Sequence, residues 1–226
     1  MTKIDDLDGK LVHITGASSG IGAALARAFA AQGAALALHF NSHEPVAGAP
    51  EAKWIRGDLS KRGEAKRVVD EAAAALGGLD ILINNAGSLG ERRPIAASQA
   101  AIAHFEKRGG GNIVNVGSVA GIDGGGAGAS VYSTAKAAVH NITRHLARDL
   151  AKKKIRVNTV APGAIATPFH ERTPPERMAA MKNATPLGRI GEARDCVGAF
   201  LFLASNELSG FVTGNLVHLN GGMYMP

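Results

Sequence analysis

The sequence predicts an α/β fold in which helices cover both faces of a doubly wound parallel sheet of about seven strands. Short apolar runs alternate with segments of helical periodicity along most of the 226 residues. Hydrophobic residues make up 46% of the chain and aromatic residues only 4%, so the core must consist of small and branched aliphatic side chains, which suit close packing of helices on a sheet. At this length we expect one domain, residues 1–226.

Each predicted strand is an apolar run that ends at turn or polar residues. The strands are expected at residues 11–14, 34–40, 53–56, 79–83, 112–117, 155–160 and 211–219. Ser60 is expected to cap a helix that ends near Leu76, and residues 193–204 are expected to form a later helix. Alternating strands and helices predict right-handed crossovers, with ligands bound at the carboxyl ends of the strands.

A glycine-rich turn follows the first strand. Gly16, Gly20 and Gly22 have the spacing G-x-x-x-G-x-G and precede a helical pattern, an arrangement that presents backbone N–H groups to a phosphate. The same stretch also matches the G-x-S-x-G nucleophile elbow of hydrolases, with Ser18 as the nucleophile. No downstream pair forms a clear acid and histidine for a triad, so the hydrolase is the weaker alternative.

The end of the second strand bears on the choice of nucleotide. An acidic residue there would bind the ribose hydroxyls of NAD. Here Phe40 is followed by Asn41 and Ser42, and no carboxylate comes before Glu44. Nothing would repel a 2′-phosphate, but no arginine is placed to bind one, so NADP is mildly favoured over NAD.

Tyr132 and Lys136 are the strongest candidates for catalytic residues. They are four residues apart on a predicted helix and therefore share one face. Phenols ordinarily ionise near pH 10, and a nearby cation favours the phenolate, so such a pair can exchange protons with a substrate. Ser118, at the end of the strand 112–117, could hydrogen-bond a substrate oxygen at the same point. A tyrosine and lysine at this spacing, taken alone, would more often be a solvated helix face.

Composition excludes several classes of function. The single Cys196 excludes an intramolecular disulfide, and the eight histidines show no metal-ligand spacing. Much of the net charge of +6 lies in residues 144–156 at a predicted helix end, and aromatic residues that would stack on bases are scarce, so we expect no nucleic-acid partner. Residues 1–10 do not form a signal peptide and no apolar run is long enough to span a membrane, so a cytoplasmic protein is expected.

Taken in order, these motifs resemble the short-chain dehydrogenase/reductase family over nearly the whole chain. The matching segments are TGASSGIG at 15–22, DL at 58–59, NNAG at 84–87, Ser118, YSTAK at 132–136, PGAIAT at 162–167 and NGG at 220–222. The resemblance implies a Rossmann-type fold and a homotetramer. It also implies that Tyr132 is the general acid/base, that Ser118 orients the carbonyl or alcohol, and that Lys136 also binds the nicotinamide ribose.

The resemblance further implies a set of residues that bind NADP or NAD. These are Gly16, Ser18, Ser19, Gly20, Ile21, Gly22, Asn41, Ser42, Asp58, Leu59, Asn85, Ala86, Gly87, Tyr132, Lys136, Pro162, Gly163, Ile165 and Thr167. The implied reaction is hydride transfer between the nicotinamide and a small-molecule carbonyl or secondary alcohol. Residues 164–188 would form a lid over the substrate. 3-Oxoacyl thioesters and sugars or polyols remain open as substrates, and a non-catalytic dinucleotide-binding regulator is a remote alternative.

The chain departs from the family at two links. Residues 41–52 join the second and third strands, but Pro45, Gly48 and Pro50 prevent a crossover helix. After Gly87 the family has a longer link with a helix that carries a catalytic Asn, and no residue here matches that position. Either the protein itself is shortened at these two links, or the printed sequence omits residues that the protein has near 44–50 and 95–97. The second interpretation is favoured, because both losses would expose apolar strands to water.

Overall fold

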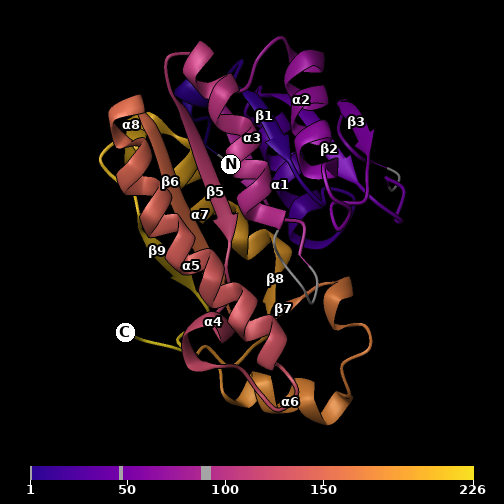
Figure 1. The fold of residues 1–226 in the computed structure, drawn as a ribbon. Helices are drawn as coiled ribbons and strands as arrows, with labels where there is room; N and C mark the ends of the chain where they lie inside the picture. Colours follow the sequence, from indigo (N-terminus) through magenta and orange to yellow (C-terminus); the bar gives the residue numbers. More distant parts are fainter. Residues whose placement is uncertain (1, 46–47, 88–92) are drawn as a thin grey trace.

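The computed structural model describes residues 2–45, 48–87 and 93–226 (Figure 1). Within these residues, seven strands pair in parallel in the order β3-β2-β1-β4-β5-β6-β9. They are β1 (Leu11–Ile14), β2 (Ala35–Phe40), β3 (Lys53–Arg56), β4 (Ile81–Asn84), β5 (Gly111–Val116), β6 (Ile155–Pro162) and β9 (Leu216–Leu219). The strand order changes direction between β1 and β4, the point where ligands bind in sheets of this kind. The predicted fold class is confirmed.

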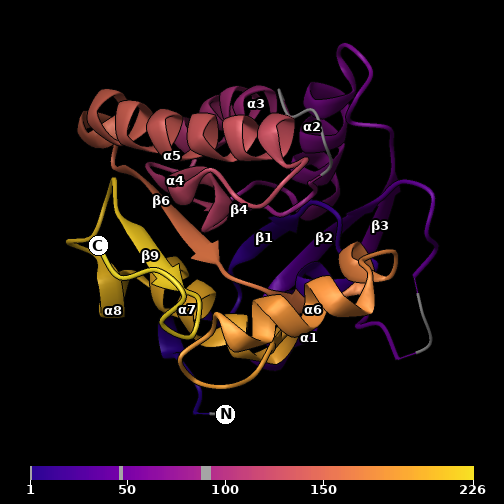
Figure 2. The same ribbon diagram turned by 90° about the horizontal axis from the view of Figure 1, so that it is seen from below.

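Helices cover both faces of the sheet, so the fold has three layers (Figure 2). One face is covered by α1 (Gly20–Ala31) and α7 (Ala193–Ala204), and the other by α2 (Glu64–Leu76), α3 (Arg93–Lys107) and α5 (Ser130–Leu150). Neighbouring strand residues face opposite layers: Ile81 and Ile83 pack towards α1 and α7, whereas Leu82 packs towards α2 and α3. Because both faces of these strands are buried, their sequences are nearly continuous runs of apolar residues.

The link between β2 and β3 contains no helix in its described residues, 41–45 and 48–52, as the sequence predicts. Trp54 of β3 covers part of the sheet instead. Its ring stands edge-on to Phe40, with 6.1 Å between ring centroids, and it packs against the core on the α1 side. Trp54 and Pro50 border a small cavity beside Arg27 of α1. The indole thus packs over part of the sheet beside this link.

Helix α3 covers the sheet beside the second short link. The helix runs without interruption from Arg93 to Lys107, and Ala97, Ala101 and Phe105 are buried against the sheet beside α2. The apolar strands are therefore covered here. The expectation that residues are missing near 95–97 stays a prediction. Residues 46–47 and 88–92, in the two links concerned, lie outside the described residues.

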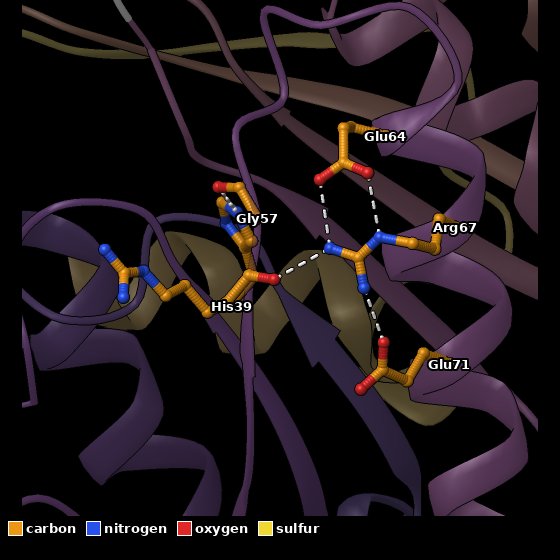
Figure 3. Close-up of polar contacts among 6 residues, drawn as sticks. His39, Gly57, Glu64, Arg67 and Glu71 are labelled. Atoms are coloured by element: carbon orange, nitrogen blue, oxygen red, sulfur yellow. Dashed lines mark hydrogen bonds and ion pairs between the residues drawn. The ribbon is translucent and has the colours of Figure 1, made fainter.

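Two predicted boundaries are also corrected. Helix α2 begins at Glu64 rather than after Ser60, because Gly63 with φ +84° starts it and the Ser60 hydroxyl donates to Asp58 Oδ1. Arg67 of α2 binds Glu64 and Glu71 of the same helix (Figure 3). It also donates to the carbonyl oxygen of Arg56 at 2.8 Å, which fixes this helix to the end of β3. The last strand begins at residue 216 rather than 211.

The remaining α-helices and strands lie near the carboxyl ends of the central strands or at the sheet edge. They are α4 (Ala120–Asp123), β7 (Ile165–Ala166), α6 (Pro175–Asn183), β8 (Gly191–Glu192) and α8 (Asn206–Ser209). Figure 2 shows α6 on one side of the strand ends and the start of α5 on the other. Across the described ranges, no helix has the length and apolar character needed to span a bilayer.

Candidate active site

The glycine-rich turn between β1 and α1 needs glycine at three positions. Gly16 and Gly20 have φ values of +64° and +54°, which L side chains rarely adopt. A Cβ on Gly22 would stand 2.2 Å from the carbonyl oxygen of Gly16. Ser19 precedes α1 in an extended conformation, and its side chain makes no capping bond to the helix. The first N–H groups of α1 are therefore not capped by Ser19, which suits a bound phosphate.

Asn85 and Thr15 fix this turn to the end of β4. The Asn85 Nδ2 group donates to the carbonyl oxygens of Thr15 and Gly16, both at 2.9 Å. The Thr15 hydroxyl accepts from the backbone N–H groups of Asn85 and Ala86, both at 3.0 Å. A Cβ on Gly16 would stand 2.9 Å from Ala86 Cα, so the two strand ends are in close contact. Gly87, the last residue of the motif, is exposed.

His39 is a structural residue of the site that the sequence analysis missed. Its Nδ1 atom accepts from the Gly16 N–H at 3.1 Å, and its Nε2–H donates to the carbonyl oxygen of Gly57 at 3.0 Å, a contact drawn in Figure 3. These bonds assign the tautomer with the proton on Nε2. The imidazole joins the turn after β1 to the residue after β3. The sequence places His39 in the second predicted strand. It does not reveal the bonding partners of His39, because these are 23 and 18 residues away along the chain.

The other residues expected near the adenosine lie around the same strand ends. Asn41 and Ser42 follow β2 and are exposed. Asp58 is partly buried and its Oδ1 accepts from the N–H of Ser60, whereas Leu59 is buried in the core beside α2. Ser18 is also buried, and Ile21 packs partly against the core on the α1 side.

Tyr132 and Lys136 lie on one face of α5, as predicted. The Lys136 Nζ atom is 5.6 Å from the centroid of the Tyr132 ring and lies over it. Only 4% of Lys136 is exposed, and its Nζ donates to the carbonyl oxygen of Val116 at 2.9 Å. The end of β5 therefore fixes the ammonium beside the phenol.

Ser118 lies two residues beyond that carbonyl group and is also buried. Its backbone N–H donates to Nε2 of His140 at 3.3 Å, and its Oγ accepts from the Ala120 N–H at 3.2 Å. Val119 donates to the carbonyl oxygen of Pro162 at 2.9 Å, which joins the serine loop to the end of β6. His140 is itself buried, so this bond ties the serine loop to α5.

The segment after β6 reaches the glycine-rich turn. A Cβ on Gly20 would stand 3.2 Å from Thr167 Cβ, so these two residues lie side by side. Ile165 is buried on the α7 side of the sheet, and Gly163 donates to the carbonyl oxygen of Leu219 at 2.9 Å. The turn, the serine loop and the segment 162–167 therefore meet at one edge of the sheet.

A buried chain of polar side chains lies among the strands below this edge. Asn84 Nδ2 donates to Ser98 Oγ and to Asn115 Oδ1, and Asn115 Nδ2 donates to Thr143 Oγ1. The Thr143 and Thr159 hydroxyls are 2.7 Å apart. This chain connects α3, β4, β5, α5 and β6. In the parts of the chain that the structure describes, no group of His, Cys, Asp and Glu could hold a metal ion.

The fold and its glycine-rich turn are those of a dinucleotide-binding α/β protein. A family model described as short chain dehydrogenase matches residues 10–98, and one described as enoyl-(acyl carrier protein) reductase matches residues 92–224. The chain is 34% identical to the 3-oxoacyl-[acyl-carrier-protein] reductase FabG of Thermotoga maritima, covering 96% of this chain and 98% of the relative. It is 36% identical to a cis-4-hydroxycyclohexanecarboxylate dehydrogenase of Sinomonas cyclohexanicum, covering 94% and 96%.

Among solved structures, a 7α-hydroxysteroid dehydrogenase in complex with NADH and 7-oxo glycochenodeoxycholic acid has a TM-score of 0.86 and 32% sequence identity, covering 98% of both chains. The chain belongs to the short-chain dehydrogenase/reductase family, whose members are NAD(P)-dependent oxidoreductases acting on carbonyl and alcohol groups. The alignment with the Thermotoga reductase spans 244 positions, more than the 226 residues of this chain, so that relative has residues that this chain lacks. The two family matches meet at residues 92–98, near the link that the sequence shows to be short.

Proposed function

We propose that this chain is a reductase of 3-oxoacyl thioesters or related ketones, folded as one domain, with Tyr132, Ser118 and Lys136 as its catalytic groups. The observation that carries the proposal is the buried Lys136 ammonium, which Val116 fixes next to the Tyr132 ring. The nearly full-length similarity to a 3-oxoacyl-[acyl-carrier-protein] reductase favours the thioester over sugars and polyols. A sugar or polyol dehydrogenase remains the second candidate.

The glycine-rich turn fits a dinucleotide. Gly16, Gly20 and Gly22 leave room that side chains would fill, and the start of α1 has no Ser19 cap. The residues after β2, Asn41 and Ser42, carry no negative charge, which supports NADP over NAD. Asn85, Ala86 and Thr167 border the turn and complete the proposed binding surface.

In the proposed reaction, a bound reduced nicotinamide supplies hydride to the carbonyl carbon. The Tyr132 hydroxyl donates its proton to the carbonyl oxygen, which becomes the alcohol. The Lys136 ammonium stabilises the phenolate that remains, and a proton from solvent restores the phenol. Ser118 donates a hydrogen bond to the same substrate oxygen. The family's fourth catalytic group, an Asn, has no match in the sequence, so three groups would perform the reaction.

We further propose a cytoplasmic homotetramer, in keeping with the family resemblance. Its subunits would meet through α5 and α3. Size-exclusion chromatography with light scattering measures this assembly directly.

The proposed function is tested with a Tyr132→Phe variant, using Tyr224→Phe as the control because these are the two tyrosines of the chain. Cofactor oxidation is followed with acetoacetyl thioesters, sugars and steroid ketones, and cofactor binding is measured separately. Tyr132→Phe should abolish turnover and keep cofactor affinity, and Tyr224→Phe should remain active. A wild-type chain that binds cofactor but reduces none of these compounds would support the regulator instead.

A further inference from the structure

A row of side chains extends from the proposed acid/base into the segment between β7 and α6. The Tyr132 ring lies 5.5 Å from the Phe169 ring, measured between centroids, and Phe169 lies 5.1 Å from His170. His170 Nδ1 is 3.1 Å from the Thr173 hydroxyl. Burial, and then the charge of Arg177, lower the pKa of His170, which places the Arg177 cation near this imidazole.

Arg177, in the first turn of α6, also contacts the loop before α5. A Cβ on Gly126 would stand 3.2 Å from Arg177 Nη2 and 3.9 Å from its Cζ, so the guanidinium lies against this glycine. Gly126 belongs to the glycine-rich run that precedes Tyr132. Arg177 therefore lies between two segments that border Tyr132. One is the loop before α5, which contains Gly126, and the other is the segment between β7 and α6, which contains Phe169.

The charge of Arg177 is not neutralised by the described part of the protein. No ion pair or side-chain hydrogen bond of Arg177 occurs in that part, and the residues three and four positions away on its helix are not acidic. Arg189, at the other end of the same connection, differs: it pairs with Asp195 at 2.6 Å. A guanidinium with its donors free is suited to a carboxylate or phosphate.

We propose that Arg177 binds an anionic group, a carboxylate or a phosphate, on the substrate whose carbonyl meets Tyr132; this inference rests on the proposed function. The anion and the reactive carbonyl lie at opposite ends of the row formed by Phe169 and His170. The rings between them pack against the connecting part of the substrate. Arg177 is thus a specificity-determining residue, outside the groups that transfer hydride or proton.

The test compares substrates that differ only in the anionic group and are long enough to extend from Tyr132 past the two rings: 9-oxodecanoate with methyl 9-oxodecanoate, and 9-oxodecyl phosphate with 9-oxodecan-1-ol. Arg177→Gln should lower the ratio of kcat/KM for the charged over the neutral member about ten-fold, mainly through KM. Arg172→Gln removes the same charge from the same exposed segment and should leave the ratio unchanged. The pair that responds distinguishes carboxylate from phosphate.

Gly126→Ala provides a second variant. The backbone of Gly126 does not have positive φ, so alanine is compatible with it, while the new Cβ would push against the guanidinium. We expect a smaller fall in the same ratio. An unchanged ratio in Arg177→Gln for both pairs would overturn the proposal.

A binding measurement keeps the inference testable if the proposed function fails. 9-Oxodecanoate and 9-oxodecyl phosphate are titrated by calorimetry into the complex with oxidised cofactor, or into the free protein if no cofactor binds. Weaker anion binding in Arg177→Gln, with normal binding in Arg172→Gln, would support the anion site without turnover. Equal binding in both variants and the wild type would refute it, whatever the enzyme reduces.

Discussion

The Ser118 amide donates to Nε2 of His140, 22 residues further along the chain, at 3.3 Å. Two glycines leave room for this imidazole: a Cβ on Gly117 would stand 2.4 Å from His140 Nε2, and one on Gly121 would stand 2.7 Å from His140 Cε1. Burial, followed by the charges of Arg144, Lys136 and His218, lowers the pKa of His140 to about 4. The imidazole is therefore neutral at neutral pH and can accept the serine-loop hydrogen bond.

This neutrality predicts a pH dependence of stability. His140 and the fully buried His13 both have a pKa of about 4 in the folded state, against 6.5 ordinarily. Between these values the unfolded chain binds more protons than the folded chain, so stability is complete above pH 6.5 and falls as the pH decreases. From pH 7 to pH 5 each histidine should cost about 2 kcal/mol.

Urea unfolding at several pH values measures this effect. His140→Gln keeps an acceptor for the Ser118 amide but cannot gain a proton. The loss of stability between pH 7 and pH 5 should be about 2 kcal/mol smaller in the variant than in the wild type. Equal losses in the two proteins would contradict the buried neutral state of His140.

Alanine should have opposite effects on stability at two glycines, Gly22 in the glycine-rich turn and Gly198 in α7. A Cβ on Gly22 would stand 2.2 Å from the Gly16 carbonyl oxygen and 2.5 Å from Asn85 Nδ2, so Gly22→Ala should lower the free energy of unfolding by about 1–3 kcal/mol and weaken cofactor binding. Gly198, on the exposed side of α7, has no atom within 4 Å of the Cβ position. Gly198→Ala should stabilise the protein by about 0.5–1 kcal/mol. Thermal melts with and without cofactor compare the pair.

The end of β2 predicts how cofactor preference can be changed. Asn41→Asp would place a carboxylate where the adenosine ribose is expected, and repulsion should weaken NADPH binding about ten-fold or more while NADH is spared. Asn41→Ala is the neutral control and should affect both cofactors alike. Fluorescence titrations of the two reduced cofactors give the ratio of dissociation constants. Equal losses for NADPH and NADH in Asn41→Asp would place the 2′-phosphate elsewhere.

The sequence predicts the layers and the central motifs because their signals are local. Strands buried on both faces form apolar runs, and Gly16, Gly20 and Gly22 lie within one turn. The approach of Lys136 to Tyr132 follows from helical spacing alone. These features depend on residues that are close in sequence, so their geometry can be derived without tertiary contacts.

The supporting histidines could not be derived in that way. His39 bonds to Gly16 and Gly57, and His140 bonds to Ser118, across turns whose paths depend on the whole sheet. The start of α2 was predicted too early because Ser60 is a plausible helix cap. The positive φ of Gly63, where the helix begins, depends on tertiary structure and cannot be derived from local sequence. Likewise, the packing of α3 shows that a short link can still cover the sheet, which apolar periodicity does not reveal.

Trp54, the indole that packs beside the link between β2 and β3, has a practical consequence. It is the only tryptophan of the chain, and it borders the same small cavity as Ser18 of the glycine-rich turn. Reduced nicotinamide cofactors absorb light in the region where indole emits, so binding at this turn should quench Trp54 emission by energy transfer. The protein therefore carries its own optical probe of cofactor occupancy, and no label needs to be attached.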